Sequence, residues 1–187
     1  ACFSPGVSVE ASFELELANQ KIKSFLADYS VDGPPMHHEL FDFEKKYLGV
    51  ENNEIYMTLQ SWMNNKAPNC SELILQMDIE GAEYSVIYQT PIEILKKFRI
   101  MVVEFHGLNN IFSSGGYELI YLTFQKILSE FEIVHIHPNN RWSPISNGLY
   151  EVPPLIEFTF LRKNRIGQIS PCTTFPNLLD VKNVKNK

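Results

Sequence analysis

The fold of this chain is decided by one stretch, Leu73-Ile74-Leu75-Gln76-Met77-Asp78-Ile79-Glu80-Gly81-Ala82-Glu83-Tyr84. Its first positions are mostly apolar, and the run then breaks into acidic residues and a glycine. This pattern is typical of a buried parallel strand that emerges at its carboxyl end. Ligands of open α/β sheets bind beyond these ends, so we expect Asp78 to face a site. In the alternative interpretation, Glu80 and Glu83 only favour the first turn of a helix through its dipole, and Gly81 only permits the turn.

The composition of the chain limits its domain count and its partners. Its 187 residues are 44% hydrophobic, which is enough for one domain with a full core. The net charge is −6 and the basic residues are scattered, so nucleic acid is not expected as a partner. There is no apolar run of about 20 residues and no leading signal segment, so no membrane association is expected for this form of the chain.

The cysteines indicate a reducing compartment. Cys2, Cys70 and Cys172 are odd in number, widely spaced and without a CxxC pair. This pattern argues against a disulfide framework and against a zinc site. We therefore expect a cytoplasmic protein.

The N-terminal region has the order of a nucleotide-binding unit. A short strand over residues 1–4 leads into a turn at Gly6, followed by a helix over 11–19, a strand over 22–27 and then Asp28. Asp28 follows Gly6 by 22 residues. This spacing is typical of a carboxylate that accepts hydrogen bonds from ribose hydroxyls. A chance strand–helix–strand unit is the alternative, because the turn holds one glycine where a full fingerprint has two or three.

Strands and helices alternate through most of the remaining chain. We predict a strand between 40 and 47, helices from Thr58 and after Glu83, and a helix capped by Thr90 with Pro91 first and Glu93 completing a capping box. A strand over 100–105 and an amphipathic helix over 117–128 follow. Strands over 131–137 and 156–161 then follow each other without a helix between them. This order predicts an α/β fold with a mostly parallel, doubly wound sheet and one antiparallel strand near the C-terminus.

Several motifs carry a resemblance to one family. The phrase Leu75-Gln76-Met77-Asp78-Ile79-Glu80-Gly81-Ala82-Glu83-Tyr84 closely resembles the central motif of FkbM-like methyltransferase domains, which use S-adenosylmethionine. Four further matches follow in order: Ser4-Pro5-Gly6-Val7-Ser8 with Phe13-Glu14, Val102-Val103-Glu104-Phe105-His106-Gly107, His135-Ile136-His137-Pro138-Asn139-Asn140, and Pro153-Pro154-Leu155-Ile156-Glu157-Phe158-Thr159-Phe160-Leu161-Arg162. Together they cover most of residues 3–163.

The resemblance implies a fold, an activity and a set of cofactor contacts. It implies a Rossmann-like class I methyltransferase domain over residues 1–163, followed by a partly disordered extension over 164–187. The implied reaction is O-methylation of a sugar or another small hydroxylated metabolite. Gly6 and Ser8 would lie under the methionine part of the cofactor, Asp28 would hold its ribose, and Asp78 would lie near its amino group and the transferred methyl.

Two departures from the family pattern keep other functions open. Pro5 precedes Gly6, and Ser8 stands where the family more often has a second glycine, so a non-catalytic module that has lost cofactor binding is an alternative. An NAD-dependent oxidoreductase is a weaker one, because the fuller glycine fingerprint is missing. The first strand begins almost at Ala1, so we expect a stabilising upstream segment to be missing from this chain.

Histidines at strand ends are the candidate bases for removing a proton from the acceptor. His106 follows one strand, and His135 and His137 lie on one face of another. We therefore select His106, Asp78, His135 and His137 as candidate catalytic residues. Together with Glu80 and Glu104, the same side chains offer oxygen and imidazole ligands for a divalent metal. Nothing in the sequence fixes their geometry, so a metal stays open and no metal site is predicted.

Overall fold

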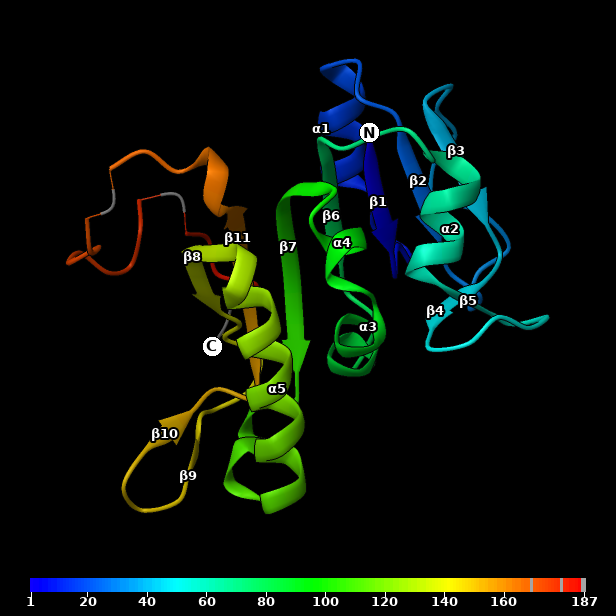
Figure 1. Ribbon diagram of the computed structural model, residues 1–187. Coiled ribbons are helices and arrows are strands. Elements are labelled where there is room, and N and C mark those ends of the chain that lie inside the picture. The colour runs from blue at the N-terminus through cyan, green and yellow to red at the C-terminus, as the bar shows by residue number, and fades with distance from the viewer. Residues whose placement is uncertain (169, 179, 186–187) are drawn as a thin grey trace.

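The structure is a computed structural model, and it describes residues 1–168, 170–178 and 180–185. Its centre is a sheet with the strand order β3-β2-β1-β6-β7-β11-β8 (Figure 1). Its strands are β1 (Cys2–Pro5), β2 (Ser24–Ala27), β3 (Phe41–Glu44), β6 (Leu73–Met77), β7 (Phe98–His106), β8 (Phe131–Pro138) and β11 (Leu155–Arg162). The order reverses direction between β1 and β6. The stretch Leu73–Met77 therefore provides a central strand.

One strand of the sheet runs against its neighbours. β1, β2, β3, β6 and β7 pair in parallel, whereas β11 is antiparallel to both β7 and β8. Its register places Glu157 opposite both Glu104 and His137. The prediction of a mostly parallel sheet with one antiparallel strand near the C-terminus is confirmed.

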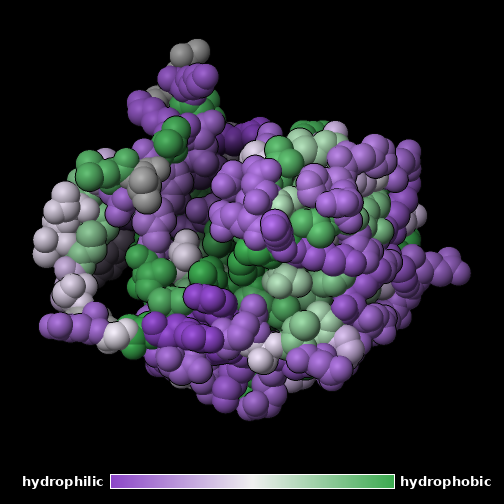
Figure 2. Space-filling view, turned by 90° about the horizontal axis from the view of Figure 1, so that it is seen from above, coloured by the Kyte–Doolittle hydropathy of each residue, from purple (hydrophilic) through white to green (hydrophobic). Residues whose placement is uncertain are grey.

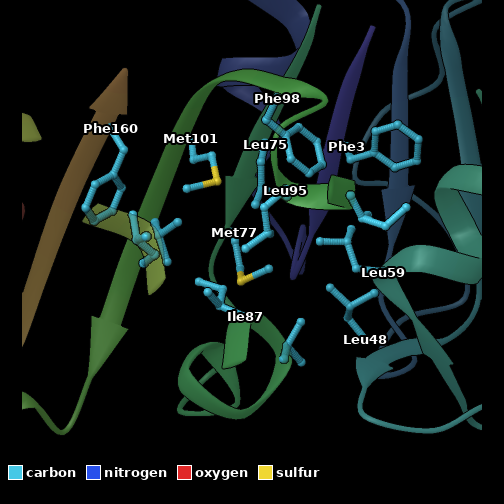
Figure 3. Close-up of a cluster of buried hydrophobic side chains, with 14 of the residues drawn as sticks. Phe3, Leu48, Leu59, Leu75, Met77, Ile87, Leu95, Phe98, Met101 and Phe160 are labelled. Atoms are coloured by element: carbon cyan, nitrogen blue, oxygen red, sulfur yellow. The ribbon is translucent and has the colours of Figure 1, made fainter. Parts of the chain in front are cut away.

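Helices cover both faces of the sheet. The main hydrophobic core lies between the sheet and α2 (Leu59–Lys66), α3 (Glu83–Gln89), α4 (Ile92–Leu95) and α5 (Ser114–Glu130). Figure 3 shows Phe3, Leu75 and Met77 of the sheet pointing into this core beside Leu59 and Ile87 of the helices. On the other face, Val7, Ala11 and Leu26 form a smaller hydrophobic cluster. Helix α1 (Ser12–Asn19) begins directly after Ala11 of this cluster. The sheet is therefore doubly wound.

Two pairs of short strands lie outside the main sheet and were not predicted. β4 (Tyr47–Gly49) and β5 (Tyr56–Thr58) form a parallel pair, and β9 (Ile145–Ser146) and β10 (Glu151–Val152) form an antiparallel one. Within the described ranges, the remaining regular elements are the 3₁₀ turns η1 (Leu108–Phe112) and η2 (Lys163–Arg165). The β4–β5 pair matters for the site, because it stands beside the ends of the central strands.

The predicted capping box at Thr90 is wrong. Helix α4 begins at Ile92, and Pro91 precedes it without a side-chain cap. The hydroxyl of Thr90 instead donates to the carbonyl of Val86, 2.7 Å away. A threonine after a helix can bond back to the preceding turn, and this contact competes with capping the next helix.

The segment after β11 returns to the edge of the sheet at β8. Asn140 Nδ2 donates to the carbonyl of Val184, and Asp180 contacts both histidines of β8. The predicted partial disorder of 164–187 stays a prediction, and its residues 169, 179 and 186–187 lie outside the described part of the chain. In the described residues, no helix has the length and apolar character needed to cross a membrane.

The candidate site lies at only one of the two ends of the parallel strands. Figure 2 looks at the molecule from above Figure 1, at the end where β1 and β7 begin. Hydrophobic residues gather at the centre of this view, and hydrophilic residues surround them. The candidate site lies at the opposite end, beyond the points where β1, β2, β6 and β7 finish.

Candidate functional site

A cavity of about 420 Å³ lies beyond the carboxyl ends of β1, β2 and β6. Its volume falls within the usual range of about 300–1,000 Å³ for small-molecule sites. The lining combines predicted and unpredicted residues: Gly6, Ser8, Ala27, Asp28, Ser30, Tyr47, Leu48, Tyr56, Asp78, Ile79, Glu80 and Ala82. The structure thus brings all four predicted cofactor residues, Gly6, Ser8, Asp28 and Asp78, to one cavity.

Gly6 is required by the packing of the loop on the central strand. Its φ is +89°, and a Cβ added there would lie 1.5 Å from the carbonyl oxygen of Asp78. The amide of Gly6 donates to the carbonyl of Ala27 at 2.9 Å, which holds the loop against β2. Any side chain at position 6 would separate the loop from β6 and open the floor of the cavity.

Asp28 holds the same loop through its carboxylate. Its Oδ2 accepts a hydrogen bond from the amide of Ser8 at 2.9 Å, and its Oδ1 accepts from the amide and hydroxyl of Ser30 at 2.8 and 2.7 Å. The side chain is buried. A carboxylate has about four acceptor positions, so Oδ2 keeps one for a ligand. Ser8 itself has φ +42°, a conformation uncommon for a residue other than glycine.

Three lining residues come from the β4–β5 pair, which was not predicted. Tyr47 and Leu48 come from β4 and Tyr56 from β5. The rings of Tyr47 and Tyr56 are 5.8 Å apart and each tyrosine is almost 40% exposed, although Leu48 beside them is buried. The only sequence signal was a pair of tyrosines on either side of the turn at Asn52 and Asn53. That signal does not show which strand ends the tyrosines face.

A group of ionisable side chains stands at one end of the cavity. Nε2 of His106 lies 3.7 Å from Oδ1 of Asp78 and 3.4 Å from Oε2 of Glu80. Its Nδ1 lies 3.1 Å from Oε1 of Glu83, a fully buried carboxylate that also accepts from the amides of Ile79 and Gly81. Glu83 therefore fixes both the turn after β6 and the orientation of the imidazole.

The crowding of these groups changes their proton affinities. Burial, and then the negative charge of Glu104, raise the pKa of Asp78 to about 7. Burial alone would lower the pKa of His106, but the hydrogen bond and charge of Glu83, with the charges of Asp78 and Glu80, raise it to about 9. The raised pKa of His106 favours its protonated form at neutral pH, and the raised pKa of Asp78 makes its carboxylate a stronger base than an ordinary one.

His135 and His137 are not brought to this group. Both lie on β8, and β11 separates β8 from β7. Nε2 of His135 is 2.8 Å from Oδ1 of Asp180, and Nε2 of His137 is 3.0 Å from Oδ1 of Asn183. These partners come from the segment after β11. Of the four candidate catalytic residues, Asp78 and His106 share a site, and a catalytic role for the β8 histidines stays an untested prediction.

Comparisons with known proteins agree with this architecture. A family model described as the methyltransferase FkbM domain matches residues 10–136. A search of curated proteins found no match. Among solved structures, the chain is similar to an E. coli protein provisionally described as a DNA modification methyltransferase encoded within a prophage, with a TM-score of 0.51 and 11% identity. That match covers 90% of this chain but 48% of the other, so the chain spans about half of that protein's length, and the likeness shows the fold alone.

The matched family segment extends over more than half of the chain and contains Asp28, Asp78 and His106. It leaves Gly6, Ser8 and β11 outside, but the structure joins these to the same sheet and cavity. The resemblance read from the sequence motifs is thereby confirmed. This chain belongs to the FkbM methyltransferase domain family.

Proposed function

We propose that this chain transfers a methyl group from S-adenosylmethionine to an oxygen atom of a small hydroxylated metabolite or sugar. The observation that carries the proposal is the cavity at the carboxyl ends of β1, β2 and β6, which has Asp28 in its lining and Asp78 beside His106. Crevices at this edge of a doubly wound sheet are the usual binding places of nucleotide-like ligands. The family supports a methyl-transfer reaction.

The lining residues fit the chemical groups of this cofactor. The remaining acceptor position of Asp28 suits a ribose hydroxyl, and the rings of Tyr47 and Tyr56 offer apolar surface to the base. Asp78 and Glu80 supply negative charge that suits the sulfonium and ammonium groups. When bound, the cofactor supplies a methyl group whose bond to sulfur breaks with both electrons staying on sulfur.

The chain's own residues have to align the acceptor and remove its proton. Methyl transfer is an in-line displacement, so alignment and exclusion of water account for much of the rate. Asp78 has a pKa raised to about 7, and its carboxylate is suited to take the hydroxyl proton at neutral pH. The imidazolium of His106, held by Glu83, stabilises the negative charges around it.

The proposal is tested by heat stability followed by product mass. S-adenosylmethionine and NAD are added separately to the chain, each at saturating concentration. A ligand at 100 times its dissociation constant stabilises a protein by about 2.7 kcal/mol. We expect S-adenosylmethionine to raise the midpoint of unfolding and NAD to leave it unchanged. A panel of hydroxylated metabolites is then screened for products heavier by one methylene unit, and a shift with NAD alone would contradict the proposal.

A non-catalytic module is the second candidate, and one observation favours it. The carboxylate of Asp28 already accepts three hydrogen bonds from Ser8 and Ser30, so it has a structural task without any ligand. In such a module, neither nucleotide would change the midpoint of unfolding. The same experiment therefore distinguishes the two candidates.

A further inference from the structure

Three potential metal ligands converge at the ends of two neighbouring strands. Asp78 follows β6, and Glu104 and His106 lie at the carboxyl end of strand β7. One ligand atom from each lies within 4.8 Å of the other two, and each side chain is half-buried. Of the six residues that the sequence offered, Glu80, His135 and His137 fall outside this group. The structure thus brings three of the six candidate ligands, Asp78, Glu104 and His106, close together. These three residues are called the triad below.

A buried oxygen atom in the triad, Oδ1 of Asp78, has His106 Nε2 3.7 Å away but accepts no hydrogen bond from the described part of the chain. Among the described residues, Oδ1 of Asp78 has no hydrogen-bond partner although it is shielded from water. The same holds for Oε2 of Glu83, whose side chain is completely buried and touches His106 through its other oxygen. Buried polar atoms in folded proteins almost always have a partner, so two of them in one cluster point to a bound group.

The surroundings of the triad resemble the outer shell of metal centres. A histidine that ligates a metal usually donates its other ring N–H to a carboxylate, which fixes the ring. Glu83 provides this carboxylate at Nδ1 of His106 and leaves Nε2 directed at Asp78. Asn139 Nδ2 donates to Oε1 of Glu104 at 2.9 Å and orients a second member of the triad.

We propose that Asp78, Glu104 and His106 bind one divalent first-row transition metal ion. Two carboxylate oxygens and one imidazole nitrogen, without a thiolate, suit Mn²⁺, Fe²⁺ or Zn²⁺ rather than a soft ion. Bonds of about 2.1 Å put two ligand atoms no more than about 4.2 Å apart, so the side chains have to close by about half an ångström. Three protein ligands leave coordination positions open for water or substrate.

The ion would extend the proposed function, on which this part of the inference rests. Asp78 lines the cavity, so an ion bound to it lies at the cavity's edge. A hydroxyl bound to the ion has a lower pKa and a fixed position. The ion would then replace direct proton transfer to Asp78, and it would select acceptors that bring an oxygen donor to the metal.

The test uses Mn²⁺ as the probe, with the 187-residue chain freed of metal by a chelator and without S-adenosylmethionine. Free Mn²⁺ is measured by electron paramagnetic resonance during a titration, in about 0.15 M salt to screen diffuse attraction. We expect one ion per chain and binding at least ten-fold weaker in Glu104→Gln. Glu157→Gln is the matched control, because Glu157 lies opposite Glu104 in the sheet and the substitution is the same. It should change the affinity less than two-fold.

A second variant, Glu83→Gln, tests whether Glu83 positions the imidazole of His106 for metal binding. Glu83→Gln keeps the size of the buried side chain, and loss of an outer-shell partner typically weakens metal binding 10- to 100-fold. Circular dichroism of each variant shows whether it is folded, and Glu104→Gln carries the test if Glu83→Gln is not. Two results would overturn the inference: no saturation below about 1 mM Mn²⁺, or equal weakening by Glu104→Gln and Glu157→Gln.

The metal site and the proposed function fail separately. Saturable Mn²⁺ binding without any response to S-adenosylmethionine would support the metal site and contradict the proposed function. A response to S-adenosylmethionine with no bound Mn²⁺ would support the proposed function and contradict the metal site.

Discussion

Oε1 of Glu83 lies 3.1 Å from Nδ1 of His106, and these two residues join the start of α3 to the end of β7. Glu83 is fully buried and also accepts from two backbone amides of the turn after β6. The turn, the imidazole and the acidic end of the cavity are therefore held by one carboxylate. Most of the predictions about the site depend on this contact.

The first prediction concerns the proton on His106 in the metal-free protein. Glu83→Gln removes the charge and weakens the hydrogen bond that raise the pKa of His106 to about 9. We expect the pKa of His106 to fall toward its ordinary value near 6.5. Nuclear magnetic resonance of the imidazole nitrogens during a pH titration measures this shift, and an unchanged midpoint would show that Glu83 does not control the ring.

The same contact predicts how stability depends on pH. The folded-state pKa of His106 is raised, so its contribution to stability is fully present below about pH 6.5 and is lost as the pH rises through about 9. The free energy of unfolding of the metal-free chain should therefore fall over this window. In Glu83→Gln the fall should be smaller. Urea unfolding at a series of pH values tests this, and parallel curves for the two proteins would refute it.

A third prediction separates the two tasks of Asp28. Asp28→Ala leaves the amides of Ser8 and Ser30 without their acceptor, and each lost hydrogen bond costs about 1 kcal/mol. We expect Asp28→Ala to lower stability by about 1–3 kcal/mol and to weaken S-adenosylmethionine binding at least ten-fold. Ser30→Ala is the control, because it removes one hydrogen bond to Asp28 and keeps the carboxylate. Equal affinities in Asp28→Ala and the unaltered chain would remove Asp28 from the site.

A fourth prediction concerns the end of the antiparallel strand. Arg162 is buried and donates to the carbonyls of Ser71 and Lys96 and to the side chains of Glu72 and Asn164. Lysine cannot reproduce this set of donors, so Arg162→Lys should cost about 2 kcal/mol of unfolding free energy. Arg165→Lys should cost less than about 0.5 kcal/mol, because its pair with Glu72 is exposed. Equal losses would mean that the buried network adds nothing.

A fifth prediction concerns thiol reactivity. Cys2 is buried in β1, and burial raises the pKa of its thiol to about 12, whereas Cys70 and Cys172 are exposed. The thiolate is the reactive form, so iodoacetamide should modify two cysteines in the folded chain and three in urea. Peptide mass analysis identifies the modified residues. Rapid modification of Cys2 in the folded chain would contradict its position in the core.

The sheet was predictable because its strands carry strong local signals. The stretch around Leu75 has an apolar run with an acidic end. The predicted strands over 131–137 and 156–161, which correspond to β8 and β11, follow each other without a helix, and this order predicts an antiparallel strand. The β4–β5 pair could not be predicted in this way. Each of its strands has three residues, which is too short for a periodic pattern, and their pairing depends on a turn at Asn53.

The acidic and imidazole residues of the site were predictable from the sequence, but their grouping and the tyrosines of the lining were not. The sequence placed Asp78 and His106 at strand ends, and the sheet order that makes them neighbours follows from the fold. Glu83 was ambiguous, because an acidic residue in the first turn of a helix needs no further explanation. His135 and His137 looked equivalent to His106 in sequence. Both contact Asp180, which lies 45 residues after His135 in the sequence. This contact depends on how the segment after β11 returns to β8.

The central claim is that the cavity between Gly6, Asp28 and Asp78 binds S-adenosylmethionine. Isothermal titration calorimetry of the metal-free chain with S-adenosylmethionine tests it most directly, with Tyr47→Ala as a variant that removes one ring from the cavity lining. We expect saturable binding at one site per chain and weaker binding in the variant. The absence of binding heat at millimolar S-adenosylmethionine, or identical affinities in the two proteins, would contradict it.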